Sequence, residues 1–293
     1  MITPTFCPTT RICAKAMPLE SRSIPSSSTT CIRGGRTGHE RNAAPRPGIA
    51  RLTWLSRVGR AWRRHGWLGF SRLAIFNLGL LLSGRDSRHR YVNDTSFDRA
   101  YGVDTSGSVA IDEVTAPISA KSGAVDYEPT PPAAFSFFLA QACLTDCSGL
   151  TFIDLGSGKG RTLLLAGLAG FAKVIGVELG EELHATAKRN IDLMTASGKI
   201  SGVESICGDA RSYRFAAEPT VCFLNNPFSA DVLGLVLQHI ERSLRRDPRS
   251  FTIIYYHANH SDLLDGGASW HLVAKGNWED ASHHFAIYRW ETN

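Results

Sequence analysis

The stretch Thr151–Arg161 reads TFIDLGSGKGR, and it decides the fold. Its first five residues are rich in strand-forming side chains and predict a buried strand that carries one acid, Asp154. Arg161–Leu168 follows with leucines available for the buried face of a helix. Between them lie three alternate glycines, Gly156, Gly158 and Gly160. The pattern predicts a strand, a tight turn and a helix, with a turn that a ligand can approach closely because glycine has no Cβ.

Three classes of ligand compete for such a turn. A phosphate-binding P-loop needs a second glycine followed by Lys and Ser or Thr, but Lys159 is followed by Gly160. A dinucleotide fingerprint needs a third glycine where this chain has Arg161. The acid Asp154 beside the turn would repel a pyrophosphate and attract an ammonium or a sulfonium. S-adenosylmethionine (SAM) carries both cations, and it is the cofactor that the pattern predicts.

Further acids stand at the ends of the next predicted strands. Lys173–Leu179 ends at Glu178, which is placed to accept hydrogen bonds from both ribose hydroxyls. Val203–Asp209 ends at Asp209, placed to accept from the adenine amino group, and Ala210 follows it. The predicted cofactor residues are Thr130, Asp154, Gly156, Ser157, Gly158, Gly160, Glu178, Asp209, Ala210 and Asn225.

This order of strands, helices and acids resembles the class I SAM-dependent methyltransferases from about Tyr127 to the C-terminus. The resemblance implies a Rossmann-like, doubly wound α/β sheet that is mostly parallel and has an antiparallel C-terminal strand. A bacterial family within this class shares the YGVDTSG and YEPTP segments seen here at residues 101–107 and 127–131. The alternative is another doubly wound domain in which these acids and glycines have ordinary structural roles.

The remaining elements are predicted from periodicity. Helices are expected over Ala133–Ala142, Glu181–Ser197 and Ala230–Arg246. Strands are expected over Val221–Phe228, Ser250–Tyr256, Trp270–Lys275 and Phe285–Trp290, the last two as an antiparallel closing pair.

Charge divides the chain into unlike parts. Of 32 Lys and Arg residues and 27 Asp and Glu residues, the first 90 positions carry a net charge of +13 and the remainder −8. Residues 1–50 are rich in Ser, Pro, Gly and Arg and are expected to form a disordered basic leader, either a simple extension or a transit-like peptide. The methyltransferase domain is expected over residues 91–293, and its acidity suits a cationic substrate.

Residues 51–90 are expected to form a Trp- and Arg-rich amphipathic helical segment. The uncharged run Leu73–Gly84 is shorter than the ~20 residues of a membrane-spanning helix. Over 51–82, three interpretations stay open: a helix packed on the catalytic domain, a peripheral helix on a membrane surface, or a nucleic-acid-binding arm. No strong nucleic-acid signal is present elsewhere.

The segment Tyr127–Pro132, YEPTPP, precedes the first strand, where this fold commonly covers the methionine end of SAM. Tyr127 and Thr130 are therefore candidates for contact with cofactor or acceptor, the alternative being a rigid linker. The seven cysteines include no C-x-x-C pair, so neither zinc nor a disulfide framework is expected. His283 and His284 are expected near a surface turn rather than on a metal. These features favour a reducing cytoplasm.

The acceptor side is predicted at Asn225-Asn226-Pro227-Phe228, which follows the fourth strand. It resembles the [DN]-P-P-[YF] motif of amino-group methyltransferases, with Asn226 in place of the first proline. Two asparagines before an aromatic, with a Y-E-P segment upstream, also resemble the non-SET histone-lysine methyltransferases. The resemblance implies N-directed methylation with protein lysine as the leading acceptor.

The predicted catalytic residues are Asn225, Asn226, Phe228 and Tyr127; His257 is a further candidate base. For the two asparagines, a role in the turn or as a helix cap is the alternative. Nucleic-acid or small-molecule acceptors, and a SAM-binding module without turnover, stay open as alternative functions. The sequence does not define the acceptor or the oligomeric state.

Overall fold

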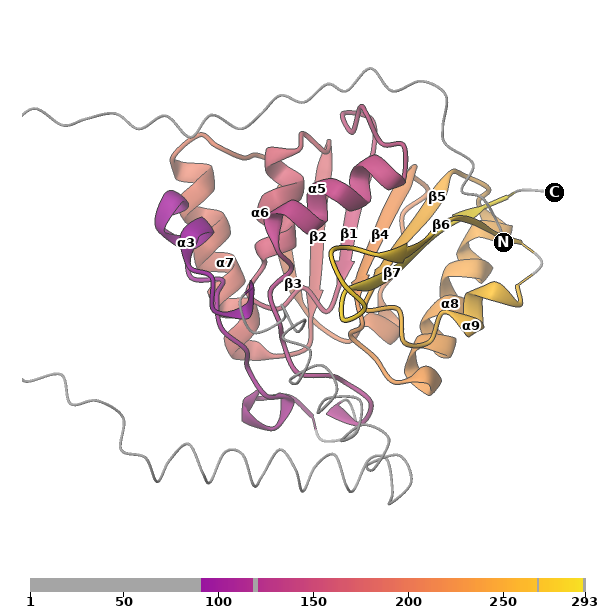
Figure 1. Cartoon of the computed structure of the whole chain (residues 1–293), viewed down its shortest axis with the longest axis horizontal. Helices are drawn as coiled ribbons and strands as arrows, with labels where there is room; N and C mark the ends of the chain where they lie inside the picture. Colours follow the sequence, from indigo (N-terminus) through magenta and orange to yellow (C-terminus); the bar gives the residue numbers. More distant parts are fainter. Residues whose placement is uncertain (1–90, 118–120, 268, 292–293) are drawn as a thin grey trace, which may run out of the picture. The chain divides into compact units, whose positions relative to one another are not determined.

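The computed structural model describes residues 91–117, 121–267 and 269–291. Its centre is a seven-stranded sheet in the order β3-β2-β1-β4-β5-β7-β6 (Figure 1). The strands are β1 (Thr151–Leu155), β2 (Lys173–Glu178), β3 (Val203–Cys207), β4 (Thr220–Asn225), β5 (Phe251–Tyr256), β6 (Trp270–Asn277) and β7 (His284–Trp290). The first five are parallel, whereas β7 is antiparallel to both β5 and β6. The predicted Rossmann-like α/β sheet with an antiparallel C-terminal strand is confirmed.

Alternate residues of the central strands supply the two cores. Phe152, Val174 and Phe223 face the helices α5 (Pro132–Gln141), α6 (Arg161–Leu168) and α7 (Glu181–Ala196), with which they share one buried cluster. Ile153, Ile175 and Leu224 face the other way and pack with α8 (Ala230–Arg246) and α9 (Asp262–Asp265). The period of two along each strand therefore separates the helical layers.

The helices begin and end close to their predicted bounds. The α8 prediction matches residue for residue, and α7 ends at Ala196 rather than Ser197. α5 begins one residue earlier than expected, at Pro132, because proline is tolerated in the first turn of a helix, where its missing N–H has no intrahelical partner. The remaining helical elements within the described residues are α3 (Ser96–Tyr101), η1 (Ile111–Glu113) and η2 (Ala210–Ser212).

The strand order reverses between β1 and β4, and this reversal positions the site. From β1 the chain moves outward through β2 to β3, then crosses back to the other side of β1 to form β4 and β5. In open α/β sheets, ligands bind at the carboxyl ends of the strands where the order reverses. The glycine turn, Glu178, Asp209 and Asn225 all follow or end parallel strands, so they lie at this same edge.

Predictions for residues 1–90 fall outside the described residues. No described helix has the length and hydropathy needed to cross a membrane.

Candidate active site

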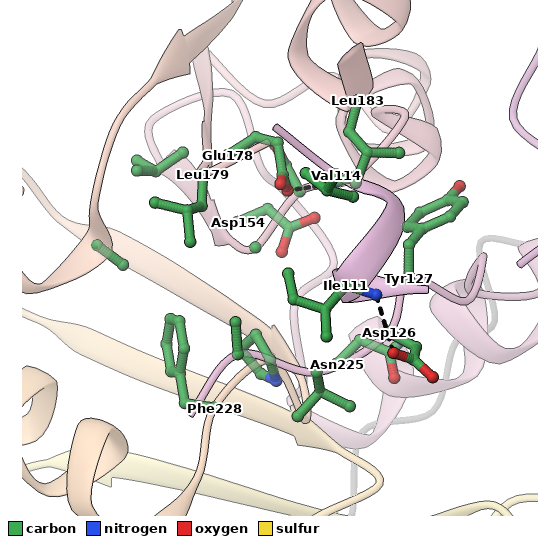
Figure 2. A pocket seen from close by; sticks show the side chains of 18 of the residues that line it. Ile111, Val114, Asp126, Tyr127, Asp154, Glu178, Leu179, Leu183, Asn225 and Phe228 are labelled. Carbon is green, nitrogen blue, oxygen red and sulfur yellow. Dashed lines mark hydrogen bonds between the residues drawn. The ribbon is translucent and has the colours of Figure 1, made fainter. Parts of the chain in front are cut away.

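A cleft opens at the reversal point of the sheet (Figure 2). One wall is formed by residues from two stretches before α5, 109–114, which include η1, and 124–130. The opposite wall comprises the glycine turn after β1 and the ends of β2, β3 and β4. Of the predicted cofactor residues, all but Gly160 line this cleft. Of the predicted catalytic residues, Asn225, Phe228 and Tyr127 line it.

The glycine turn is built for contact with other parts of the chain. Gly156, Gly158 and Gly160 all have positive φ, between 56° and 86°, which favours glycine. A Cβ on Gly158 would lie 2.0 Å from a ring carbon of Tyr127, and one on Gly156 would lie 2.6 Å from Cβ of Pro227. The sequence analysis predicted that a ligand lies close to the backbone of this turn. At these two glycines, the neighbours at that distance are the side chains of Tyr127 and Pro227.

Asp154 is a buried acid with one unsatisfied oxygen. The side chain is 3% exposed, and Oδ2 accepts a short hydrogen bond from Thr162 Oγ1. Oδ1 is buried and has no hydrogen-bond partner among the described residues. Burial, helped by the nearby negative charge of Glu178 and opposed by the Thr162 hydroxyl, raises the pKa of this carboxyl to about 7. A cation in the cleft would satisfy Oδ1 and favour the ionised form.

Glu178 is equally buried but holds the backbone of the turn. Its Oε2 accepts from the Gly158 N–H at 2.7 Å, and its Oε1 accepts from the Gly180 N–H at 2.8 Å. Burial raises the pKa of Glu178, and these N–H donors oppose that effect. Each carboxylate oxygen has a second lone pair, so Glu178 can brace the turn and still accept from ligand hydroxyls.

Asp209 lines the cleft and is paired with Arg211. Both oxygens accept from the guanidinium, and Oδ1 also accepts from the Arg211 backbone N–H at 2.9 Å. These hydrogen bonds hold the pKa of Asp209 below its usual value. Asp209 caps η2, which places Ala210 in the cleft wall.

Tyr127 covers the turn with its ring and directs its hydroxyl elsewhere. The hydroxyl donates to the Thr105 carbonyl oxygen at 2.7 Å, and burial raises the pKa of Tyr127 above its usual value. A neutral phenol already donating to a carbonyl is a poor candidate for a catalytic base. These contacts favour a structural role for Tyr127, and its predicted catalytic role stays a prediction.

Asn225 joins three parts of the acceptor end. Its Nδ2 donates to the Glu128 carbonyl oxygen at 3.0 Å and to Thr130 Oγ1 at 3.3 Å. Its Oδ1 lies 2.8 Å from Nδ1 of His257, which follows β5. Since Nδ2 must donate to a carbonyl, Oδ1 is the acceptor and His257 Nδ1 carries the proton. The amide orientation is thereby fixed.

Asn226 and Phe228 differ in position. Asn226 has a φ of 43°, does not line the cleft, and accepts from the Tyr255 hydroxyl at 3.2 Å through Oδ1. These contacts are typical of a turn residue, which is the alternative role that the sequence analysis gave for Asn226. Phe228 is buried in the cleft wall. Its backbone pairs with that of Ala124, on the opposite wall, through an isolated antiparallel bridge.

The sequence analysis did not identify residues 97–107 as part of the site. We call this segment, which contains YGVDTSG, the strap. The strap binds the glycine turn at two points. Lys159 Nζ donates to Asp104 and to the Ser106 carbonyl oxygen, both at 2.9 Å. Arg161, the first residue of α6, bonds to Asp98, Thr105 and Ser106. The alternation of Asp, Thr and Ser with glycines in DRAYGVDTSG was the available signal.

The histidines after β5 and before β7 form an aromatic cluster. His283 is buried, not near the surface as expected, and makes a short hydrogen bond with the Tyr256 hydroxyl. His257 stacks on Tyr256 with ring centroids 3.9 Å apart. Within the described part of the chain, no group of three or more His, Cys, Asp or Glu residues is arranged to hold a metal ion.

Comparison with known proteins gives structural neighbours only. No family model matches the chain, and no curated protein matches it. A SAM-bound magnesium protoporphyrin IX methyltransferase from Synechocystis is 14% identical, with 54% of this chain and 77% of that chain covered and a TM-score of 0.42. An RNA methyltransferase from Salinibacter ruber, solved with S-adenosyl-L-homocysteine, is 22% identical, with 55% and 92% covered and a TM-score of 0.38. Similarity at this level carries no conclusion about ligand or substrate. The resemblances to the bacterial family and to histone-lysine methyltransferases stay predictions.

Proposed function

We propose that this protein is a SAM-dependent methyltransferase. The observation that carries the proposal is Asp154, a carboxyl that is buried in the cleft with an unsatisfied oxygen and a raised pKa. An anionic ligand at this position would add repulsion to a site that already disfavours one negative charge. A ligand with an ammonium and a sulfonium supplies the missing positive charge.

The other polar groups of the cleft fit the remaining parts of this cofactor. Glu178 offers acceptor positions for the ribose hydroxyls, and Asp209 with Ala210 lies at the end of the next strand, where the adenine would bind. When bound, SAM supplies an electrophilic methyl group on a sulfonium. The chain's own task is then to orient an acceptor and to exclude water, which is where positioned active sites gain most of their rate.

The acceptor end of the cleft favours an amine. Phe228, Val232 and Ala124 give it an apolar wall, and the acids Asp126 and Glu128 line it beside Asn225. An aliphatic chain with a terminal ammonium matches that combination, because the methylenes contact the apolar wall and the acids attract the charge. We therefore favour N-directed methylation, with protein lysine as the leading acceptor class.

A lysine must lose its proton before it can attack. At pH 7.4 this costs about 3 pKa units, or ~4 kcal/mol. The apolar wall lowers that cost, because burial disfavours the charged amine, whereas the acids Asp126 and Glu128 favour the charged form and oppose this effect. Asn225 Oδ1 has a second lone pair beyond the one that His257 uses, and it can accept an N–H bond that aims the nitrogen lone pair.

The test is a methyl-transfer assay with the full chain, radiolabelled SAM and a cell lysate. The labelled material is separated into protein, nucleic-acid and small-molecule fractions, and labelled protein is hydrolysed to identify methylated lysine. Label in lysine supports the proposal. Label confined to nucleic acid or small molecules would contradict the acceptor class and retain the enzyme. Binding of SAM with no labelled fraction would indicate a SAM-binding module.

A further inference from the structure

A second pocket lies outside the cleft, between the second half of α8 and the loop that follows η2. Its volume is about 550 Å³, and among the described residues none lines both this pocket and the cleft. The loop contributes Arg214 and the buried ring of Phe215, and α8 contributes the remaining lining residues. Pockets of this size hold small organic ligands.

The side of α8 that lines this pocket is cationic. Its four lining residues have the spacing i, i+3, i+4 and i+7, which places them on one side of the helix: His239, Arg242, Ser243 and Arg246. Arg214 lines the same pocket from the loop, and no acid is among the described lining residues. Positive charge is therefore gathered around one pocket.

Two of these arginines have no partner within the described part of the chain. Arg214 and Arg242 are exposed and form no hydrogen bond or ion pair there. Arg246 donates through Nε to Asp247 at 2.7 Å, but it also lies four residues after Arg242, a like-charge spacing that destabilises a helix. Burial lowers the pKa of the neighbouring Arg249, and the charge of Arg246 adds to this effect while Asp247 opposes it. An anion in the pocket would relieve this repulsion.

Two further groups on the pocket wall are arranged as hydrogen-bond donors. Ser243 Oγ accepts from Arg249 Nη2 at 3.0 Å, so its own proton is available to another acceptor. His239 Nδ1 lies 3.2 Å from the Arg211 carbonyl oxygen, which only accepts, so Nδ1 carries a proton. The other ring nitrogen, Nε2, becomes a donor when the imidazole is protonated.

The dipole of α8 explains only part of this charge. Cations are stabilised in the last turn of a helix, where Arg245 and Arg246 lie. Arg242 precedes that turn, and Arg214 lies outside the helix altogether. These two arginines, which also lack partners, therefore need another explanation.

We propose that this pocket binds a small ligand that carries a phosphate group. Guanidinium groups donate pairs of hydrogen bonds to phosphate oxygens, and the three arginines and the serine hydroxyl match the several oxygens of one phosphate. A small anion is favoured over a nucleic-acid strand, because residues 91–293 have a net charge of −8, which repels a long polyanion. The pocket is separate from the cleft, so this inference does not rest on the proposed function.

The test is isothermal titration of the full chain with inorganic phosphate and with ribose 5-phosphate, in phosphate-free buffer at a fixed chloride concentration. The wild type should bind at least one of them with a dissociation constant below about 1 mM. Arg214→Gln and Arg242→Gln should each weaken that binding roughly 10- to 100-fold, the effect of losing one charge-assisted contact. Tighter binding of ribose 5-phosphate would identify the ligand as a phosphate ester, and tighter binding of inorganic phosphate would identify it as the free ion.

Arg245→Gln is the matched control. It removes one positive charge from the same helix, but Arg245 donates to Glu241 at 2.8 Å and does not line the pocket. Binding should stay within about 2-fold of the wild type, because salt screens charges that do not contact the ligand. The control also accounts for residues 1–90, whose net charge of +13 attracts phosphate in every variant alike.

Three outcomes would overturn the site. One is the absence of binding of both phosphate compounds by the wild type. Another is equal weakening by Arg242→Gln and Arg245→Gln, which would show a general attraction to positive charge. The third comes from a parallel titration with single-stranded DNA of about 12 nucleotides. If the pocket variants weaken DNA binding while neither phosphate compound binds, the pocket is a nucleic-acid surface and the small-ligand proposal is wrong.

Discussion

At the scale of single residues, most polar side-chain atoms of the site already have hydrogen-bond partners within the protein. Glu178 and Asn225 are held by backbone and side-chain contacts, whereas Asp154 keeps one buried oxygen open. Burying a polar atom without a hydrogen bond costs about 1–3 kcal/mol. Such a cost is expected where a ligand later supplies the contact.

Asp154→Asn should therefore weaken SAM binding by roughly 10- to 100-fold. The substitution retains the shape of the side chain and an acceptor for Thr162, but it removes the charge, which is worth ~1.5–3 kcal/mol toward a cation, and replaces the open acceptor oxygen with an N–H donor. Isothermal titration measures the effect. Glu182→Gln is the control, because Glu182 is an exposed acid that bonds to Thr115 outside the cleft. Wild-type affinity in Asp154→Asn would show that the ammonium site lies elsewhere.

Asn225→Ala should separate binding from chemistry. It removes the amide that joins Glu128, Thr130 and His257, and with it an acceptor for the substrate amine. We expect SAM affinity within a few-fold of the wild type and turnover reduced roughly 10²-fold, the signature of an interaction made mainly in the transition state. Asn226→Gly should retain most activity, because glycine adopts the same positive φ. Full turnover in the Asn225→Ala, Asn226→Ala double variant would refute a role for both asparagines.

At the scale of elements, the sequence alone predicted those helices and strands whose residue pattern is contained within the element itself. Apolar runs bounded by turn residues predicted the parallel strands, and α8 was predicted to the residue. The strap could not be predicted as part of the site, because its contacts join residues far apart in the chain, such as Asp98 and Arg161. The burial of His283 was missed for the same reason: its partner Tyr256 ends β5, far from it in the sequence.

The packing of the Tyr127 ring on Gly158 is another contact between residues far apart in the chain, and it can be tested by substitution. Gly158→Ala and Gly170→Ala both place a Cβ at positive φ, but only Gly158 faces a ring, since nothing lies within 4 Å of a Cβ at Gly170. Both variants should lose about 1–2 kcal/mol of unfolding free energy to backbone strain. Gly158→Ala should lose a further 1–3 kcal/mol to overpacking. Urea unfolding measures both.

A double variant tests the cause of that extra loss. Tyr127→Ala removes the ring, so Gly158→Ala should cost less in that background than in the wild type, by more than about 0.5 kcal/mol. Additive losses in the double variant would show that the ring is not what Gly158 accommodates.

At the scale of the whole molecule, the buried acids connect stability to pH. The pKa of Asp154 is raised from 3.8 to about 7 in the folded chain, so the folded state holds a proton that the unfolded state has released between these values. Stability from this group is present at low pH and is lost as pH rises toward 7. Asp98 and Asp209 have lowered pKa values, so their contribution is lost instead when pH falls below about 4.

Asp154 alone should therefore lower the free energy of unfolding of the ligand-free protein between pH 5 and 7, by up to about 1.4 kcal/mol per pH unit. Asp154→Asn does not titrate, so the difference between wild type and variant isolates this acid from Glu178, whose pKa is also raised. SAM favours the ionised carboxylate, so its affinity for the wild type should rise with pH and level off above about 7, by at most tenfold per unit. Denaturant unfolding and titration calorimetry at matched pH values check the two slopes. A wild-type affinity for SAM that is independent of pH, or an Asp154→Asn variant whose SAM affinity rises with pH as steeply as that of the wild type, would show that Asp154 does not meet a cation in this cleft.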